Sequence, residues 1–201
     1  MASAAILTGG AATRFGGTDK GALIVGGRSI LARQLEELTA ITDDIMIVGD
    51  KPTRAPRLEH GRHARAVPDR LAACGPLAGL EAALVAARHD TTIVVACDMP
   101  FVTAAFLRFL ASLTTDAAAV VPCTEDGYHP LCAAYTRACL PVVTRRLTEG
   151  RLAVMSLFEE LRTRVVTSEE IAAFGDRARL LANVNTPAAF GEIEALLSHE
   201  T

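Results

Sequence analysis

Short apolar segments alternate with helical patterns along most of this chain. The segments at 4–8, 45–48, 92–97 and 117–122 are almost continuously apolar and partly β-branched. Runs of this kind are typical of strands that are covered on both faces, as in a parallel sheet. We therefore predict β-strands over these four segments.

Between the predicted strands, apolar side chains recur at intervals of three and four residues. The two clearest rows are Ile30, Leu31, Leu35 and Leu38, and Leu77, Leu80 and Leu84. This spacing predicts amphipathic helices that each turn one apolar stripe to the sheet. Strands that alternate with helices indicate the α/β class, here a Rossmann-like three-layer α/β/α fold with a mostly parallel central sheet.

Helix starts and loops follow from single residues and from local composition. Thr103 is expected to cap a helix, and Thr186 followed by Pro187 matches an N-cap with proline at the first helical position. Residues 50–70 contain three prolines and six Lys or Arg, which predicts a long exposed loop. We interpret the acidic pairs at 43–44 and 159–160 as surface charges.

The same loop contains His60 and His63 among several arginines, Arg65 included. Two histidines three residues apart could hold a metal or, with the arginines, an anion. We interpret this group instead as a solvated loop face, since charge runs are usually exposed.

Composition limits the class of protein. The 201 residues suit one domain over 1–201, and a content of 50% hydrophobic and 21% charged residues excludes wholesale disorder. The net charge of −3 gives no basic excess for nucleic acid, and the apolar runs are too short to cross a membrane. The N-terminus lacks the charged region of a signal peptide, so we expect a cytoplasmic protein. The five cysteines form no C-x-x-C pair, which favours small buried thiols.

A glycine-rich segment, LTGGAATRFGGTDK over residues 7–20, directly follows the first predicted strand. Ligands of α/β sheets bind beyond the carboxyl ends of the strands, which is where this segment lies. Its glycine spacing fits neither the dinucleotide fingerprint nor the Walker A loop. A dehydrogenase is therefore not supported.

The residue types of this segment nevertheless suit phosphate. Gly9 and Gly10 allow backbone N–H groups to approach an anion closely, while Arg14 adds a bidentate fork and Lys20 a point charge. The alternative is a flexible surface loop with two solvated cations. The residues alone leave both interpretations open.

A series of motifs in the same order resembles one family, the molybdenum cofactor guanylyltransferases. The opening L-T-G-G-x-x-x-R-F-G-G-x-D-K is similar to that family's L-A-G-G-x-x-x-R-M-G-x-D-K. The later matches are Pro68-Asp69, Gly75-Pro76-Leu77-Ala78-Gly79, Cys97-Asp98-Met99-Pro100-Phe101, His129-Pro130 and Asn183-Val184-Asn185-Thr186-Pro187. The resemblance covers nearly the whole chain. Here Thr8 replaces the usual Ala and Phe15 the usual Met.

The resemblance implies a reaction and its substrates. It implies transfer of GMP from GTP to the terminal phosphate of Mo-molybdopterin, which forms the guanine dinucleotide cofactor and pyrophosphate, with Mg²⁺ as cofactor. It also implies transient contacts with proteins of the cofactor pathway or with recipient molybdoenzymes. Two alternatives stay open: a cytidylyltransferase that makes the cytosine dinucleotide, and a non-catalytic nucleotide-binding protein of the same fold.

The resemblance also implies roles for residues of the first loop. Main-chain groups of residues 7–10, which are Leu7, Thr8, Gly9 and Gly10, would contact the base and the phosphates. Lys20 would stabilise charge on the α-phosphate and on departing pyrophosphate, and Arg14 would assist at the β and γ groups.

The remaining implied site residues lie further along the chain. Asp98 would bind Mg²⁺, for which one or two carboxylates suffice, although an aspartate here could also simply cap a turn. Asp69 would contact either the guanine base or the ribose, or else is a solvated loop acid. Gly75 and Gly79 would shape the nucleotide loop. His129 and Pro130 either line the acceptor pocket or form a turn between strands.

Overall fold

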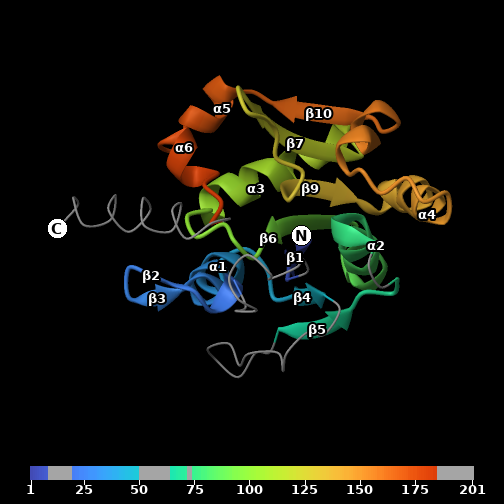
Figure 1. Ribbon diagram of the computed structural model, residues 1–201. Coiled ribbons are helices and arrows are strands. Elements are labelled where there is room, and N and C mark those ends of the chain that lie inside the picture. The colour runs from blue at the N-terminus through green and yellow to red at the C-terminus, as the bar shows by residue number, and fades with distance from the viewer. Residues whose placement is uncertain (9–19, 50–63, 72–73, 185–201) are drawn as a thin grey trace.

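A computed structural model of the chain describes residues 1–8, 20–49, 64–71 and 74–184. Over these residues a central sheet runs in the order β10-β7-β9-β6-β1-β4-β5, with β8 paired to the end of β7 (Figure 1). A separate hairpin pairs β2 with β3. The strands are β1 (Ala2–Leu7), β2 (Ile24–Val25), β3 (Arg28–Ser29), β4 (Ile45–Gly49), β5 (Arg65–Pro68), β6 (Thr91–Ala96), β7 (Ala119–Thr124), β8 (Gly127–Tyr128), β9 (Cys132–Thr136) and β10 (Thr163–Val166).

The strand directions confirm the predicted mostly parallel sheet. Strands β5, β4, β1 and β6 pair in parallel, as do β7 and β10. Strand β9 runs antiparallel to both β6 and β7, so β7 and β10 point the same way as the others. The carboxyl ends of all the parallel strands therefore lie along one edge of the sheet.

Helices cover both faces of this sheet. The α-helices are α1 (Ile30–Thr39), α2 (Gly75–Ala86), α3 (Ala104–Ser112), α4 (Leu140–Thr148), α5 (Ser168–Ala172) and α6 (Arg177–Leu180). The short 3₁₀ helices are η2 (Lys20–Ala22), η4 (Leu113–Asp116), η5 (Arg137–Cys139) and η6 (Met155–Glu159). None of the helices in these parts of the chain is long and apolar enough to cross a membrane.

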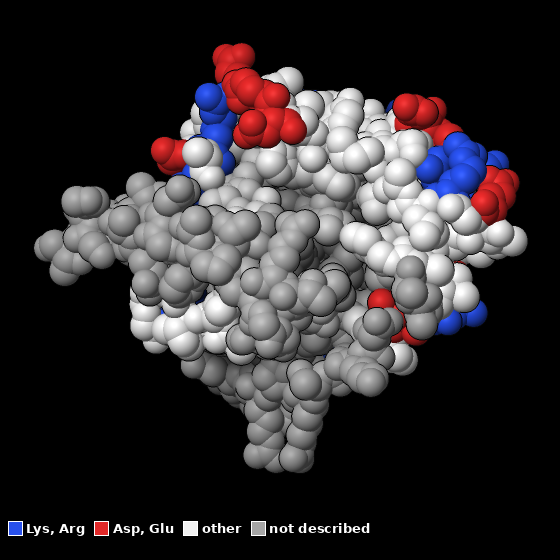
Figure 2. All heavy atoms as spheres, viewed as in Figure 1, with Lys and Arg blue, Asp and Glu red and all other residues white. Residues whose placement is uncertain are grey.

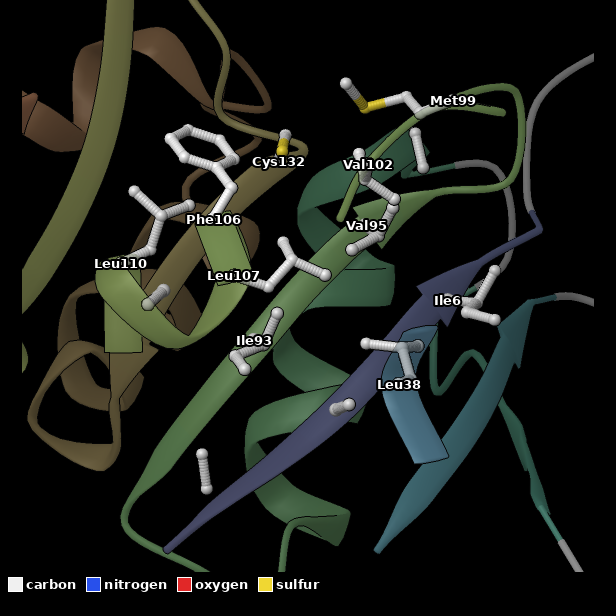
Figure 3. Packing of buried hydrophobic residues seen from close by; sticks show 14 of the residues in the cluster. Ile6, Leu38, Ile93, Val95, Met99, Val102, Phe106, Leu107, Leu110 and Cys132 are labelled. Carbon is white, nitrogen blue, oxygen red and sulfur yellow. The ribbon is translucent and has the colours of Figure 1, made fainter. Parts of the chain in front are cut away.

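Successive side chains of the strands enter different cores. On β1, Ala4 and Ile6 pack with residues of α1 and α3, whereas Ala5 and Leu7 pack with residues of α2 and α4. Figure 3 shows the first core, where Phe106 and Leu107 of α3 lie over β6. Because neighbours on a strand point to opposite faces, a strand covered on both faces is apolar throughout. This is the three-layer α/β/α arrangement expected from the sequence.

A side-chain hydroxyl caps the start of three of the described helices, namely α1, α3 and, at Thr167, α5. The Ser29 side chain accepts a hydrogen bond from the Ala32 N–H at 3.2 Å and starts α1. Thr103 accepts one from the Phe106 N–H at 3.4 Å, as predicted for α3. The predicted cap at Thr186 lies outside the described residues.

Helix α2 departs from the predicted single apolar stripe. Every residue from Leu77 to Leu84 is buried, Glu81 included, so the helix is enclosed on nearly all sides. Helix α4 packs against its outer side, and Thr144 of α4 donates a hydrogen bond to Glu81 at 3.3 Å. The row of leucines identifies the side of α2 that faces the sheet. The opposite side of α2 is covered by α4, which begins more than fifty residues later in the chain.

The predicted long loop at 50–70 is wrong over its last part. Residues Arg65–Pro68 form strand β5, which pairs in parallel with β4 at the edge of the sheet. An edge strand buries few side chains and tolerates proline at its end, so its composition resembles that of a loop. His60 and His63 lie outside the described residues.

Asp44 and Arg65 are not solvated as predicted but form a polar cluster with Ser3. The Asp44 side chain is buried, and it accepts hydrogen bonds from Ser3 Oγ at 2.6 Å, the Arg88 N–H at 2.9 Å and Arg65 Nη2 at 2.6 Å. Burial alone would raise the pKa of Asp44, but these hydrogen bonds outweigh burial and lower it. The cluster ties β1, β4, β5 and the end of α2 together at the amino edge of the sheet.

Asp44→Asn should lower the free energy of unfolding at pH 7 by about 3 kcal/mol, because it leaves Arg65 and the Arg88 N–H without their buried anion. The folded-state pKa lies below the unfolded one, so this stabilisation is lost as pH falls through the folded value. The difference between the two proteins in urea unfolding should therefore begin to shrink as pH falls below about 4 and should vanish only below the folded pKa of Asp44. The exposed neighbour Asp43 supplies the control, since Asp43→Asn should change the free energy of unfolding little. Equal losses of stability in Asp43→Asn and Asp44→Asn would contradict the role of the cluster.

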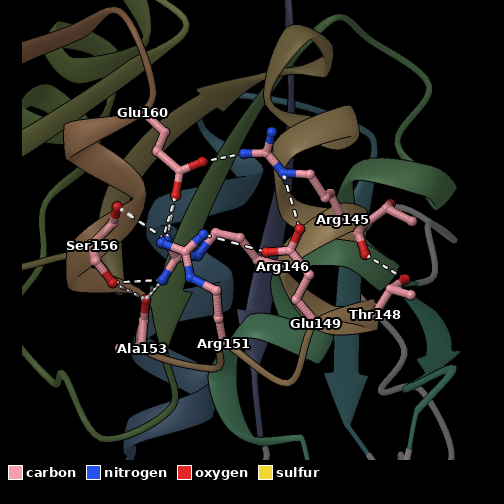
Figure 4. A network of polar contacts seen from close by, with 9 residues as sticks. Arg145, Arg146, Thr148, Glu149, Arg151, Ala153, Ser156 and Glu160 are labelled. Carbon is pink, nitrogen blue, oxygen red and sulfur yellow. Dashed lines mark hydrogen bonds and ion pairs between the residues drawn. The ribbon is translucent and has the colours of Figure 1, made fainter.

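A second polar cluster surrounds Glu160, which is exposed as predicted but has ion-pair partners that the sequence did not reveal. Its carboxylate accepts hydrogen bonds from Arg145, from Arg146 at 2.6 Å and from Arg151 at 3.1 Å (Figure 4). Arg146 is only 2% exposed and also donates to the Ser156 hydroxyl and the Ala153 carbonyl. These contacts fasten the segment after α4 onto that helix, which in turn covers α2.

Charged side chains of the described residues gather in small mixed clusters. Figure 2 shows red and blue atoms side by side near α4 and again near α5 and α6. The ion pairs Arg151–Glu149 and Arg177–Glu125 belong to these clusters. Of the five free cysteines, those at 97, 132 and 139 are buried as expected, and those at 74 and 123 are partly exposed.

Candidate active site at the carboxyl edge of the sheet

The predicted site residues follow several different strands. Thr8 comes after β1, Asp69 after β5 and Asp98 after β6. Because these strands are parallel, the three positions share the carboxyl edge of the sheet, where α/β proteins bind their ligands. Figure 1 shows β1, β4 and β6 side by side in the sheet, and Leu7 and Thr8, the described residues of the glycine-rich segment, lie at the carboxyl end of β1.

The end of β1 is held by both neighbouring strands. The Cys97 N–H donates to the Leu7 carbonyl at 3.1 Å, while the Thr8 N–H and hydroxyl both donate to the Val48 carbonyl, at 2.8 and 3.0 Å. The hydroxyl that replaces the family's usual alanine therefore adds a bond to β4. The start of the glycine-rich segment is thus anchored on two sides.

Three residues of that segment, Gly9, Gly10 and Arg14, lie outside the described residues. For Lys20 the structure describes only the backbone, which begins η2 ahead of the β2–β3 hairpin. The roles that the sequence suggested for these four residues stay predictions.

Leu7, Asp69 and Gly79 meet in one wall of the site. A Cβ atom added to Gly79 would lie 3.4 Å from Leu7 Cδ2 and 3.7 Å from Asp69 Oδ1. The Asp69 N–H donates to the Gly49 carbonyl at 3.1 Å, which holds this aspartate against the end of β4. These distances show that α2 packs directly against the ends of β1 and β5, although a Cβ at position 79 would make only ordinary van der Waals contacts there.

Gly75 begins α2 with a φ of +64°, a conformation that side-chain-bearing residues rarely adopt. Pro76 follows at the first turn of the helix, where its missing N–H costs no hydrogen bond. The Gly-Pro pair therefore turns the chain from the Asp69 side into the helix that carries Gly79. The first turn of α2 begins beside that wall of the site.

Asp98 lies in a tight turn after β6. The Met99 N–H donates to the Ala96 carbonyl at 3.3 Å, and the Val184 N–H donates to the Asp98 carbonyl at 2.8 Å. Val184 is itself fully buried in a small core with Val25 and Ile30. The last described residue thus ties the Asp98 turn to the hairpin and to the start of α1.

One contact of this turn was missed by the sequence analysis. Gln34 of α1 is fully buried, and its Nε2 donates to the carbonyls of Ala96 at 2.7 Å and Met99 at 2.9 Å. A polar residue directly before Leu35, four residues after Ile30 on the apolar side of the helix, is the signal that could have revealed it.

His129 and Pro130 form a turn between β8 and β9, one of the two roles considered for them. The His129 N–H donates to the Pro122 carbonyl at 2.9 Å, and its ring contacts Thr124 Oγ1 at 3.0 Å. Burial lowers the pKa of His129, although Asp126 opposes this effect, so the imidazole is neutral at pH 7. The turn lies at the carboxyl edge, since the Ala96 N–H donates to the Leu131 carbonyl at 2.7 Å.

Asp98 is the candidate magnesium ligand at this edge, and Asp69 lies along the same edge. One carboxylate oxygen of each, Oδ1, is buried. Among the described residues no group of three or more His, Cys, Asp or Glu could hold a metal. Magnesium usually takes only one or two carboxylates together with phosphate oxygens and water, so the residues present fit a metal that arrives with a nucleotide.

An α/β sheet whose strands are followed at their carboxyl ends by two aspartates, and whose first strand is followed in sequence by a glycine-rich segment, is typical of nucleotide-binding proteins. Residues 4–165 match the MobA-like NTP transferase domain. The chain belongs to this family and is a nucleotidyltransferase. The match confirms the family resemblance deduced from the motifs.

Curated relatives extend over nearly the whole chain. The molybdenum cofactor guanylyltransferase of Desulfosudis oleivorans is 31% identical over 194 residues, which are 96% of this chain and 94% of the relative. A protein of Pelotomaculum thermopropionicum named probable molybdenum cofactor guanylyltransferase is 31% identical over 187 residues, 93% of this chain and 89% of the relative.

Solved structures share the fold at lower identity. The molybdopterin-guanine dinucleotide biosynthesis protein A of Archaeoglobus fulgidus superimposes with a TM-score of 0.79 at 23% identity, covering 99% of this chain and 100% of that one. The 2-C-methyl-D-erythritol 4-phosphate cytidylyltransferase of Thermus thermophilus gives 0.65 at 16% identity, covering 96% and 98%. The second likeness shows that the fold by itself does not decide which nucleotide is used.

Proposed function

We propose that this nucleotidyltransferase transfers GMP from GTP to the terminal phosphate of Mo-molybdopterin, forming the guanine dinucleotide cofactor and pyrophosphate. The observation that carries the proposal is the meeting of Leu7, Asp69 and Gly79 beside the Asp98 turn at the carboxyl edge. These are the positions that the guanylyltransferase motifs select, in a chain whose curated relatives carry that name. We further propose that residues 1–201 form one catalytic domain.

The reaction needs no covalent enzyme intermediate. An oxygen of the acceptor phosphate attacks the α-phosphorus of GTP, and the bond from that phosphorus to the bridging oxygen breaks, so that pyrophosphate leaves with the electron pair. Both reactants are polyanions, so the protein has to position them in line and offset their charge. In this proposal Lys20 stabilises the α-phosphate and the leaving group, and Arg14 the β- and γ-phosphates.

The nucleotide is held by the wall described above. Main-chain groups of Leu7, Thr8, Gly9 and Gly10 contact the base and the phosphates, and Gly75 and Gly79 shape the loop that α2 presents. Asp69 accepts hydrogen bonds from the guanine base or the ribose. Asp98 would hold Mg²⁺, which would supply positive charge to offset that of the phosphates.

The acceptor is proposed to enter beside the His129–Pro130 turn, because this turn borders the Asp98 turn through the Leu131–Ala96 hydrogen bond. Delivery of the product would require transient contacts with cofactor-pathway proteins or recipient molybdoenzymes.

Calorimetry should show GTP·Mg²⁺ binding more tightly than CTP·Mg²⁺ by about 10-fold or more, since a site that pairs with guanine leaves polar groups unpaired when cytosine enters. Pyrophosphate release with GTP, CTP and ATP tests the donor under turnover. Equal or reversed affinities would contradict the guanylyl assignment and favour the cytidylyl alternative. Binding of GTP with no pyrophosphate release in the presence of the acceptor would favour a non-catalytic nucleotide-binding protein.

A further inference from the structure

The side chain of Gln34 donates hydrogen bonds to the backbone of the Asp98 turn. Gln34 lies on α1, more than sixty residues away in sequence, and its side chain is fully buried. The single Nε2 amide group bridges the two ends of the turn, with the Ala96 carbonyl 2.7 Å away and the Met99 carbonyl 2.9 Å away. The side chain thus spans the residues that flank Asp98 on both sides.

The chemistry of this contact suits an amide. An NH₂ group carries two donor hydrogens, so one nitrogen can give each of the two carbonyl oxygens a hydrogen of its own. The Oε1 atom of Gln34 is buried and accepts no hydrogen bond from the part of the chain that the structure describes. An uncompensated buried acceptor is a cost, which indicates that the side chain is placed for its two donors.

The other side of the turn is held by a different element. The Val184 N–H donates to the Asp98 carbonyl at 2.8 Å, so the carbonyls of residues 96, 98 and 99 each accept a hydrogen bond from a distant part of the chain. Of these contacts, only the pair from Gln34 comes from a side chain and can be removed by substitution without altering the backbone.

We propose that Gln34 is a positioning residue for Asp98: its bridge across the Ala96 and Met99 carbonyls fixes the direction in which the Asp98 carboxylate meets the metal–nucleotide complex. The inference rests on the proposed function of Asp98. Groups that orient a metal-binding carboxylate through the surrounding structure typically change metal affinity or activity 10- to 100-fold when removed.

Gln34→Met preserves the length of the side chain and its packing but removes both donors. We expect kcat to fall about 10-fold and the half-saturating Mg²⁺ concentration to rise about 10-fold, with KM for GTP at saturating Mg²⁺ changed less than about 3-fold. The matched control is Leu38→Val, one turn further along the same helix and equally buried. It should destabilise the protein without shifting the Mg²⁺ dependence.

A measurement on the free protein, without nucleotide or metal, distinguishes a positioning role of Gln34 from a general loss of stability in the variant. Amide hydrogen exchange of residues 96–100 in the free protein should be faster in Gln34→Met than in Leu38→Val at matched melting temperatures. If Gln34→Met fails to fold, Gln34→Asn takes its place, because it retains the amide on a side chain too short to bridge both carbonyls. It should show the same rise in the half-saturating Mg²⁺ concentration and the same faster amide exchange of residues 96–100.

Equal Mg²⁺ dependence and equal exchange in the Gln34→Met and Leu38→Val proteins, with Asp98→Asn inactive, would overturn this inference and leave the proposed function standing. An active Asp98→Asn enzyme with unchanged Mg²⁺ requirement would instead count against the metal-binding role proposed for Asp98. In the Asp98→Asn background, Gln34→Met should lower the residual rate of transfer no further, because the carboxylate that Gln34 positions is already gone. A further loss equal to that seen in the wild-type background would contradict the inference that Gln34 acts through Asp98.

Discussion

Asp98→Asn is expected to reduce nucleotidyl transfer by on the order of 10³, because it removes the negative charge that a hard cation requires. Asparagine preserves the size of the side chain and caps a turn about as well as aspartate, so the turn before Pro100 should persist. The melting temperature without ligand should change by less than about 2 °C. Calorimetry should show that GTP binding has lost its dependence on Mg²⁺.

The change Asp116→Asn, at the exposed last residue of η4, provides a charge-matched control that should leave both transfer and Mg²⁺ dependence unaltered. The outcome that would remove Asp98 from the site is full activity of Asp98→Asn at the usual Mg²⁺ concentration. In that case the aspartate serves only the local turn.

Lys20→Ala is expected to lower turnover by on the order of 10² or more, since it removes charge stabilisation directed at the transition state. Binding of GTP should weaken far less than turnover, because backbone groups of the first loop and the α2 wall would still hold the nucleotide. Single-turnover measurements with saturating GTP and acceptor test this directly. Lys20→Arg should recover only part of the rate, because a planar guanidinium does not replace a compact ammonium.

Arg28→Ala is the matched control for this prediction. Arg28 is a nearby exposed cation on β3, paired with Glu36 of α1 at 2.6 Å, and its loss should leave turnover unchanged. Near-normal turnover of Lys20→Ala would show that the lysine is a solvated loop cation, as the composition of the segment also allowed.

Much of this fold was predictable from local pattern. Strands β1, β4, β6 and β7 were expected because a strand covered on both faces must be apolar along its whole length, and their observed bounds differ from the predicted ones by a few residues at most. Strands β5, β9 and β10 were not predicted. They are four or five residues long, and β5 and β10 mix polar with apolar side chains.

The candidate site was predictable for a similar reason. Ligands bind where parallel strands end, so motifs that directly follow strands, such as those with Asp69 and Asp98, point to one edge of the sheet. Their relative order in space follows from the fold class. The contact of Gly79 with Leu7 and Asp69 does not, because it depends on how closely α2 packs on the sheet.

By itself, then, the sequence determined the strand–helix alternation and the motifs at the strand ends, because both depend only on residues that are close together in the chain. Only the tertiary structure decided the state of three polar residues. Asp44 meets Ser3 across 41 residues, Gln34 meets Met99 across 65, and Glu160 meets Arg146 across 14. An aspartate, glutamine or glutamate is hydrophilic in any local pattern, and whether it is solvated or buried depends on the partners that distant segments bring to it.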